Sequence, residues 1–331
     1  MAVTAADLTV AICTRNRPAL LRRALRSVTA QREPPGEILV VDNAPADDAT
    51  RVLVEAEFPG ARYVVEPVAG LDAARNRALR SATRDVVALL DDDGVADPGW
   101  TAALAAAFRD HPAAGLCTGR VEPLSLETEA QRLFEANGGM PFPDSETRLC
   151  LPADGRRLMG GRRAPAIAWA LTAGCGCNLA VRRELALALG GFDESLDVGT
   201  PLPGAGDSDM ILRVLEAGAE VVCEPAALVR HEHRRELDAM HDQVIGYQRA
   251  LVALTARAAA RTPAARRLPV LAFLGWRLVK PAVRLARRAA GRDVLPAGVL
   301  LRMLWEGWRG LASYSPAGPA RQGREQAAPC S

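Results

Sequence analysis

Short apolar runs alternate with helix-like stretches along the first 115 residues of the chain. A run of strand length is followed by a stretch with helical spacing, and this order occurs four times. The successive segments are residues 8–13, 19–31, 38–42, 49–58, 63–66, 73–81, 86–90 and 98–108. This alternation predicts a mostly parallel sheet with helices on both faces, and ligands bound at the carboxyl ends of the strands.

The pattern changes between about residues 120 and 170, where Pro, Gly and polar residues dominate. A loop of this length inside a compact domain is usually functional, so we interpret the stretch as a functional insertion. Regular signals return as a strand at 174–181, helices at 182–189 and 208–217, and a short strand at 220–223. The α/β pattern therefore continues to about residue 223.

The last part of the chain is predicted to be helical and is strongly basic. Residues 241–331 contain 15 Arg or Lys and 4 Asp or Glu, whereas residues 1–240 contain 26 and 35. Its apolar stretch at 268–274 is too short and too charged to span a bilayer. Three of the five Trp of the chain lie in this region: Trp276, Trp305 and Trp308. Two interpretations stay open, namely an interfacial contact with anionic lipid, and a helical pair packed on the catalytic domain with an Arg-rich solvent face.

The length of 331 residues accommodates one large α/β domain and an appendage. We predict a catalytic domain over residues 1–240, with one half at 8–115 and the other at 116–240. A basic amphipathic helical region follows at 241–317, and residues 318–331 are expected to be a disordered tail.

Signals for export or disulfide bonding are not visible in the sequence. The apolar run at 8–13 has the length of a strand and follows Asp7, which is unlike a signal peptide. The seven Cys are odd in number and scattered, and Cys175 and Cys177 have no second pair or His near them in the sequence, so a structural zinc site is not expected. We expect a cytoplasmic protein, with the inner face of the plasma membrane as an alternative place.

Three consecutive carboxylates, Asp91, Asp92 and Asp93, follow the apolar run at 86–90. Crowding like charges costs free energy, and a divalent cation would remove that cost. Mg²⁺ and Mn²⁺ prefer oxygen ligands, which they share with substrate phosphates. A solvated acidic turn is the alternative, but the position at the carboxyl end of a strand favours a ligand site.

A second acidic element, with Asp207 and Asp209, follows two glycines and precedes a helix. Either carboxylate could cap that helix, since Asp is favoured at helix starts. A carboxylate on a loop near a metal is also a suitable general base, so both residues are candidates for catalysis.

Asp72 and Arg75 lie in the first turns of the helix predicted after Gly70. Helix starts favour anions, so Arg75 could neutralise a phosphate group; alternatively, it could form an ion pair with Asp72.

The ends of the first two predicted strands carry hydrogen-bonding side chains. Thr14, Arg15 and Asn16 follow the first strand, and Asp42 ends the second. These side chains are placed where a nucleotide base and ribose would lie. Turn formation by Asn and Asp is the alternative interpretation.

Two of the four His in the chain, His231 and His233, lie beside Arg234 and Arg235. In an extended segment the two imidazoles face the same side. One of them could complete a metal shell with the Asp triplet while an Arg meets a pyrophosphate, although such a pair also occurs on surfaces and in packing.

Taken in order, these segments resemble the family 2 glycosyltransferases of GT-A fold over about residues 8–235. The succession consists of Thr14-Arg15-Asn16-Arg17, Val41-Asp42-Asn43, residues 70–76, Asp91-Asp92-Asp93, Gly191-Phe192-Asp193-Glu194, and Gly206-Asp207-Ser208-Asp209 with Arg213. The resemblance implies a GT-A-like, Rossmann-like α/β fold, with a mostly parallel sheet flanked by helices, to which the C-terminal helical extension is added.

The resemblance also implies an inverting transfer of a sugar from a nucleotide diphosphate donor, with UDP expected, to an acceptor hydroxyl. The acceptor would be a carbohydrate, a lipid-linked compound or a small molecule, and the cofactor Mn²⁺ or Mg²⁺. Residues 8–115 would then be the nucleotide-binding half of the catalytic domain and residues 116–240 the acceptor half, which contains the insertion at 120–170. The implied roles are donor binding by Thr14, Arg15, Asn16, Asp42, Asp72, Arg75, Asp92 and Arg234, metal binding by Asp91, Asp93 and His231, and proton abstraction by Asp207 or Asp209.

Two departures and two alternatives accompany the resemblance. Gly206 stands where the family often has Glu, and Cys13 and Arg15 stand where relatives often have an aromatic residue that stacks on the base.

Residues 91–95 also resemble the nucleophile motif of haloacid-dehalogenase-like phosphohydrolases, which would use Asp91 covalently. A non-catalytic scaffold that binds nucleotide sugar is the other alternative. No nucleic-acid partner is expected, because the basic tail has few residues to read or stack on bases.

Overall fold

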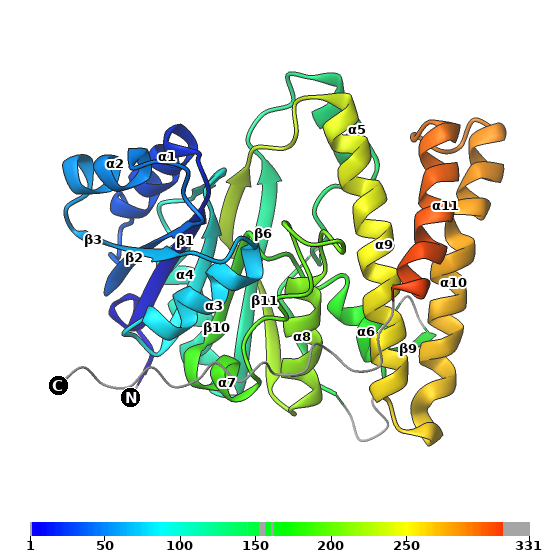
Figure 1. Ribbon diagram of the computed structural model, residues 1–331. Coiled ribbons are helices and arrows are strands. Elements are labelled where there is room, and N and C mark those ends of the chain that lie inside the picture. The colour runs from blue at the N-terminus through cyan, green and yellow to red at the C-terminus, as the bar shows by residue number, and fades with distance from the viewer. Residues whose placement is uncertain (1, 144, 152–155, 160–161, 314–331) are drawn as a thin grey trace.

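The computed structural model describes residues 2–143, 145–151, 156–159 and 162–313. A twisted central sheet with helices around it forms the N-terminal part, and three long helices stand along one side (Figure 1). The predicted disordered tail, residues 318–331, lies outside the described residues.

Four parallel strands form the N-terminal half of the sheet, in the order β3-β2-β1-β4. These strands are β1 (Leu8–Thr14), β2 (Glu37–Asn43), β3 (Ala61–Glu66) and β4 (Val86–Asp91). The helices that alternate with them are α1 (Pro18–Thr29), α2 (Ala49–Glu57), α3 (Leu71–Ser81) and α4 (Trp100–Asp110). Alternate residues of β1 belong to two different core clusters, because helices cover both faces of the sheet.

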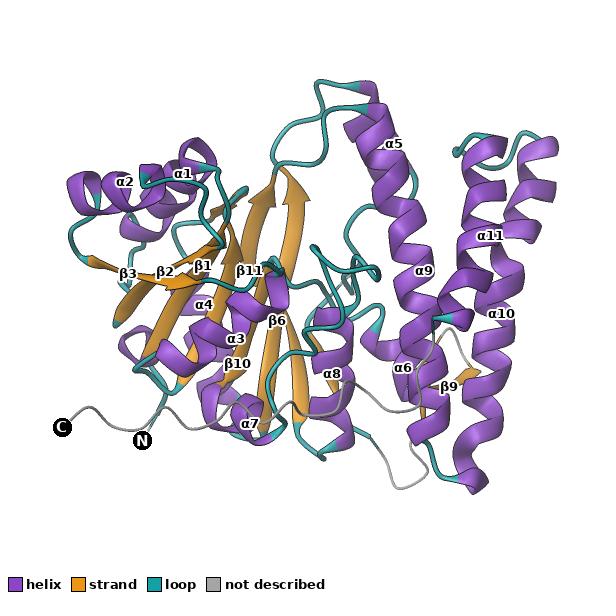
Figure 2. Ribbon diagram, in the orientation of Figure 1, coloured by secondary structure: helices purple, strands orange, loops and turns teal. Residues whose placement is uncertain are grey.

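The second half of the sheet is mixed. Strand β10 (Asn178–Arg182) runs antiparallel to β4 and to β6 (Ala114–Pro123). Strand β11 (Glu220–His231) is parallel to β6 and antiparallel to β5 (Gly94–Ala96) and β7 (Thr147–Leu149). Helices α7 (Arg183–Ala188) and α8 (Gly206–Glu216) complete this half, which Figure 2 shows beside the parallel strands. Parallel pairing thus dominates only the first four strands.

The sequence-based interpretation of residues 120–170 as irregular was wrong for much of this stretch. The additional elements are α5 (Glu129–Ala136), β8 (Arg156–Met159), β9 (Arg162–Pro165) and α6 (Ala166–Ala170), together with β7. Helix α5 begins with a capping box in which Thr128 and Gln131 bond to each other's backbone. Strand β11 is also longer than the predicted strand at 220–223, because the chain resumes pairing after a register shift near Pro225.

Three helices follow the sheet: α9 (Leu237–Arg261), α10 (Ala264–Ala289) and α11 (Ala297–Ala312). Helix α9 crosses the boundary predicted at residue 240 and contributes Ala250, Ala253 and Leu254 to a core cluster shared with the sheet. Helices α10 and α11 pack outside α9 (Figure 1). Among the described residues, no helix is long and apolar enough to cross a membrane.

Candidate active site

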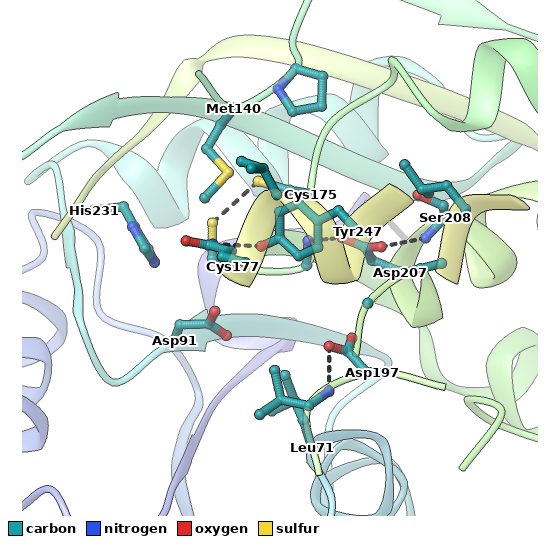
Figure 3. Close-up of a pocket in the computed structure, with 18 of the residues that line it drawn as sticks. Leu71, Asp91, Met140, Cys175, Cys177, Asp197, Asp207, Ser208, His231 and Tyr247 are labelled. Carbon is teal, nitrogen blue, oxygen red and sulfur yellow. Dashed lines mark hydrogen bonds between the residues drawn. The ribbon is translucent and has the colours of Figure 1, made fainter. Parts of the chain in front are cut away.

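A cavity of about 550 Å³ lies at the carboxyl ends of β1 and β4. Its walls come from the Asp triplet, the loop before β10, the start of α8 and the inner faces of α9 and α10. The pairing register explains why strand ends meet here, since Thr14 is opposite Asp42, and Cys13 is opposite Asp91. Figure 3 shows Asp91, His231 and Asp207 around this space.

Two members of the Asp triplet are held by neighbouring side chains. Arg17 Nη1 donates to Asp92 Oδ1 at 2.6 Å and to Asp93 Oδ2 at 3.2 Å. The Thr14 hydroxyl donates to Asp92 Oδ2 at 2.7 Å. Arg17 is a site residue that the sequence interpretation missed, although it stands in the motif after the first strand. Asp92 is thereby fixed, while Asp91 is freer to meet a ligand.

Asp93 and His231 form a close pair, with Asp93 Oδ1 3.0 Å from His231 Nε2. Burial lowers the pKa of His231, but the hydrogen bond and charge of Asp93 outweigh this effect and raise the pKa overall. For Asp93 burial raises the pKa, and His231 and Arg17 reverse the effect, so the carboxylate stays ionised. The predicted metal residues from the triplet and from the end of β11 are therefore adjacent.

Asp91, Cys177 and His231 offer three ligand atoms that lie within 4.8 Å of one another. Burial raises the pKa of Asp91 to about 6, even though Arg75 opposes the shift. A divalent cation fits this group because its charge would favour the ionised form of a buried carboxylate. No His lies near Cys177 in the sequence, and it is the fold that brings His231, at the end of β11, to this cysteine.

Arg75 is held by one carboxylate of its own helix, α3, and by one from a distant segment. Its Nη1 donates to Asp72 Oδ1 at 2.9 Å and to Asp197 Oδ2 at 2.7 Å. All three residues are buried, and Arg75 and Asp197 line the cavity, whereas Asp72 does not. Asp72 therefore positions Arg75, which agrees with the ion-pair alternative. Asp197 was missed because it lies 122 residues from Arg75 in the sequence.

The two candidate bases have different surroundings. Asp207 lines the cavity, and its carboxylate accepts hydrogen bonds from Gly176 N at 2.7 Å and Ser208 N at 2.6 Å. Burial and the charge of Asp197 raise the pKa of Asp207. Asp209 is 2% exposed and pairs with Arg213 at 2.7 Å and with an Arg of α9. Neither is the cap of α8, whose N-cap is Ala205.

The predicted donor-binding residues divide into two groups. Those that line the cavity are Thr14, Arg15, Arg75, Asp92 and Arg234. Asp42 is fully buried and accepts from the Tyr63 hydroxyl at 2.8 Å, and Asn16 accepts from Ala46 N at 2.9 Å in a turn. Asn43, which the sequence interpretation did not single out, lines the cavity instead. Asp42 and Asp72 thus lie behind the wall that the other residues form, and Asn16 is exposed in the loop after β1.

His231 and His233 face each other, with their Nδ1 atoms 3.3 Å apart, as the spacing predicts. His233 Nε2 is 2.7 Å from Glu135 Oε1 of α5. His233 therefore links His231 to Glu135 on α5, a helix that the sequence interpretation did not anticipate.

Helices α9 and α10 contribute cavity residues from the region that the sequence interpretation placed outside the catalytic domain, as helices either packed on it or in contact with lipid. Tyr247 and Gln248 come from α9, and Arg277, Lys280 and Arg284 come from α10. The helical spacing of the three cations was a signal that could have indicated a common face.

Comparison with known proteins agrees with this fold. The family model for glycosyl transferase family 2 matches residues 9–189. The pre-mycofactocin glycosyltransferase of Mycobacterium tuberculosis is 31% identical over 242 residues, which cover 70% of this chain and 44% of that protein. The glucosyl-dolichyl phosphate glucuronosyltransferase of Haloferax volcanii is 25% identical over 242 residues, which cover 70% of this chain and 72% of that protein.

A solved structure extends the comparison to most of the chain. The mannosyltransferase of Pyrobaculum calidifontis, in complex with GDP-Man and Mn²⁺, matches with a TM-score of 0.58 and 23% identity. The match covers 96% of this chain and 84% of that one.

The fold is therefore that of the GT-A glycosyltransferases, and the predicted fold class is confirmed. The chain belongs to glycosyl transferase family 2, as the sequence resemblance indicated. It spans less than half the length of the Mycobacterium relative. The matched region contains the Asp triplet and ends before Asp207 and His231, so their roles rest on the geometry of the cavity.

Proposed function

We propose that this chain is a metal-dependent glycosyltransferase that moves a sugar from a nucleotide diphosphate donor to an acceptor hydroxyl with inversion. The observation that carries the proposal is that Asp207 and the Asp91–Cys177–His231 group line the same cavity. A base and a cation site on one cavity meet the two needs of this reaction, which are proton removal from the acceptor and stabilisation of the leaving diphosphate.

The donor would lie against the carboxyl ends of β1 and β4. Arg15, Arg75 and Arg234 supply positive charge for a diphosphate. Asp91, Asp93 and His231 would hold the metal, with Cys177 beside them, and Thr14 and Asn43 stand near the expected nucleoside. A UDP-linked donor is our first choice from the family resemblance; the Pyrobaculum neighbour contains GDP-Man with Mn²⁺, which supports a metal but leaves the nucleotide open.

Asp207 would act as the general base. The backbone N–H groups of Gly176 and Ser208 fix the orientation of its carboxylate, and its raised pKa favours proton uptake. As the acceptor oxygen attacks the anomeric carbon, its proton passes to Asp207 and the bond to the diphosphate breaks. One displacement without a covalent enzyme intermediate inverts the configuration, which distinguishes the proposal from a phosphohydrolase that uses Asp91 covalently.

Calorimetry with UDP, GDP and dTDP tests the donor half of the proposal. Each nucleotide is titrated with Mn²⁺ or with EDTA, into the unchanged chain and into Asp93→Ala. We expect one nucleotide to bind with Mn²⁺ only, and Asp93→Ala to weaken it strongly. Absence of binding to all three would overturn the proposal, whereas binding without consumption of any matching nucleotide sugar would support the scaffold alternative.

We also propose a peripheral contact between the C-terminal helices and an anionic membrane surface. Trp276 on α10 is 49% exposed, and Trp305 and Trp308 on α11 are 66% and 53% exposed. The basic excess of the region would meet anionic headgroups while the indoles enter the interface. This contact would bring the protein to lipid-linked acceptors.

A further inference from the structure

Helix α10 presents three cations to the cavity, at the side formed by the C-terminal helices. Arg277, Lys280 and Arg284 are three and four residues apart, so they share one face of the helix, and all three line the cavity. Lys280 and Arg284 also line a second cavity of about 290 Å³ between α10 and the end of α5, together with Arg287, Arg292 and Asp293. Cations of α10 therefore contribute to the walls of both spaces.

Only one of the three cations is neutralised by a carboxylate within the described residues. Arg284 pairs with Asp293 at 2.6 Å. Arg277 donates to the Gln248 amide oxygen at 3.3 Å, and its buried Nε has no partner. For Lys280 no hydrogen bond or ion pair is found in the part of the chain that the structure describes. Two cations thus reach the cavity without a counter-charge.

Without a bound anion, this arrangement disfavours the charged forms of Arg277 and Lys280. Burial lowers the pKa of Arg277 to about 10. Burial, together with the charges of Arg277 and Arg284, lowers the pKa of Lys280 to about 8, and the charge of Asp293, the smallest of the four effects, opposes the shift. An anionic ligand would reverse both effects through charge-assisted hydrogen bonds.

Arg277, Lys280 and Arg284 form a row of cations along α10. The diphosphate of the donor is not the anion that this row would bind. The donor phosphates are expected at the carboxyl ends of β1 and β4, where Arg15 and Arg75 lie. The row on α10 contacts α9 through Gln248, and the neighbouring Tyr247 packs near the loop that leads to Asp207. Figure 3 shows Tyr247 between Cys177 and Asp207. The row therefore lies on the acceptor side.

Apolar side chains line the cavity close to this row. They come from α5, the loop after it, and α9, α10 and α11, and include Phe134, Met140, Val244, Leu251, Pro281 and Met303. Such a wall accommodates a hydrocarbon portion next to the charged group. The site combines the two features that an amphiphilic anion requires.

We propose that Lys280 and Arg277 form an acceptor subsite for a phosphate monoester or diester attached to an apolar group, with the acceptor hydroxyl directed to Asp207. The assignment to the acceptor rests on the proposed function; the binding of a phosphate amphiphile by this row does not. Lys280 is the one Lys of the chain, all other cations being Arg, so its chemistry can be followed selectively.

Binding of three probes to the full chain tests the subsite. Octyl phosphate, inorganic phosphate and octanol are titrated by calorimetry, with and without UDP and Mn²⁺, at concentrations below micelle formation. We expect octyl phosphate to bind at least tenfold more tightly than either other probe. If inorganic phosphate alone binds tightly, the ligand of the subsite is a free phosphate ion and not an amphiphile. This result would overturn the apolar part of the proposal.

Variants on one helix distinguish the subsite from general charge effects. Lys280→Gln and Arg277→Gln should each weaken octyl phosphate at least tenfold and leave UDP affinity unchanged, and Lys280→Arg should restore most of the affinity. Arg266→Gln is the matched control, since Arg266 is exposed at the start of α10. An equal loss of octyl phosphate and UDP affinity in Lys280→Gln would assign the cations to the donor and overturn the proposal.

A second measurement does not depend on variants. Reductive methylation with ¹³C-formaldehyde keeps the charge of Lys280 and gives one side-chain NMR signal, separate from that of the terminal amine. Octyl phosphate should raise the pKa read from this signal, and an unchanged titration would overturn the proposal. If the probe binds while no nucleotide does, the subsite stands and the proposed sugar transfer fails.

Discussion

Gly206 at the start of α8 lies directly against the carboxylate of Asp72 on α3. A β-carbon on residue 206 would overlap Asp72 Oδ2, which is buried and has no hydrogen-bond partner in the described structure. The absence of a side chain at residue 206 therefore permits α8 to approach Asp72, which in turn holds Arg75 at 2.9 Å. The close approach of Asp72 therefore leaves no room for a side chain at residue 206.

Gly206→Ala is expected to destabilise the protein by about 1–3 kcal/mol, because overpacking a filled site displaces side chains or backbone. Thermal denaturation measures the loss. Asp72→Ala removes the obstructing carboxylate, so the double variant should lose less than the sum of the two single losses. An unchanged melting temperature in Gly206→Ala would show that the two groups are not in contact.

Asp207→Asn should lower kcat by roughly 10²–10⁴ while nucleotide affinity is retained, because an amide cannot accept the acceptor proton. Asp209→Asn is the matched control from the same helical turn. It weakens buried ion pairs with Arg213 and Arg261, so it should lower the melting temperature and leave the kcat of the folded protein within a fewfold of the original. The opposite pattern would make Asp209 the base.

Asp197→Asn should move the acidic limb of the kcat profile to lower pH. The base works when ionised, so the rate falls as the pH drops through the pKa of Asp207, which burial and Asp197 raise. Removing the negative charge of Asp197 favours ionised Asp207, and Arg75, released from one partner, acts in the same direction. An acidic limb that stays at the same pH or moves to higher pH would contradict the assignment of Asp207 as the general base.

Cys177→Ser should weaken Cd²⁺ and Zn²⁺ binding more than tenfold and Mn²⁺ binding much less, because a thiolate is a soft ligand. The hydrogen bond between Cys177 and Cys175, together with burial, raises the Cys177 pKa, so metal binding through sulfur should release a proton. Calorimetry in buffers of different ionisation enthalpy measures both effects. Cys175→Ser is the control, and equal loss of all three metals would remove Cys177 from the metal group.

The exposed Trp of α10 and α11 predict binding to anionic vesicles. Cosedimentation with phosphatidylglycerol vesicles should exceed that with phosphatidylcholine vesicles, and it should decrease with salt. Replacement of Trp276, Trp305 and Trp308 by Ala should reduce the bound fraction severalfold. Val52→Ser on α2, which removes an apolar side chain that is 56% exposed, should have no effect. Equal binding to both vesicle types would contradict the proposal.

Periodicity in the sequence was sufficient for the parallel half of the sheet, because strands buried on both faces are continuous apolar runs separated by amphipathic helices. The polar residues at the ends of these runs, Thr14 and Asp91, were expected at a ligand site because parallel strands end at one edge, and both line the cavity. The same logic misplaced Asp42, because Asn43 is the residue that ends β2 at the cavity, while Asp42, one residue earlier, lies behind the wall and accepts a hydrogen bond from Tyr63.

The sequence by itself thus determined the fold class, the family and the acidic strand end at the centre of the site. Tertiary structure decided that Cys177 joins His231, that Asp197 holds Arg75, and that Lys280 reaches the cavity. These partners come from loops and helices whose paths depend on packing against the whole sheet. The ionisation of each group depends on burial and on charges distant in sequence, neither of which a local pattern records.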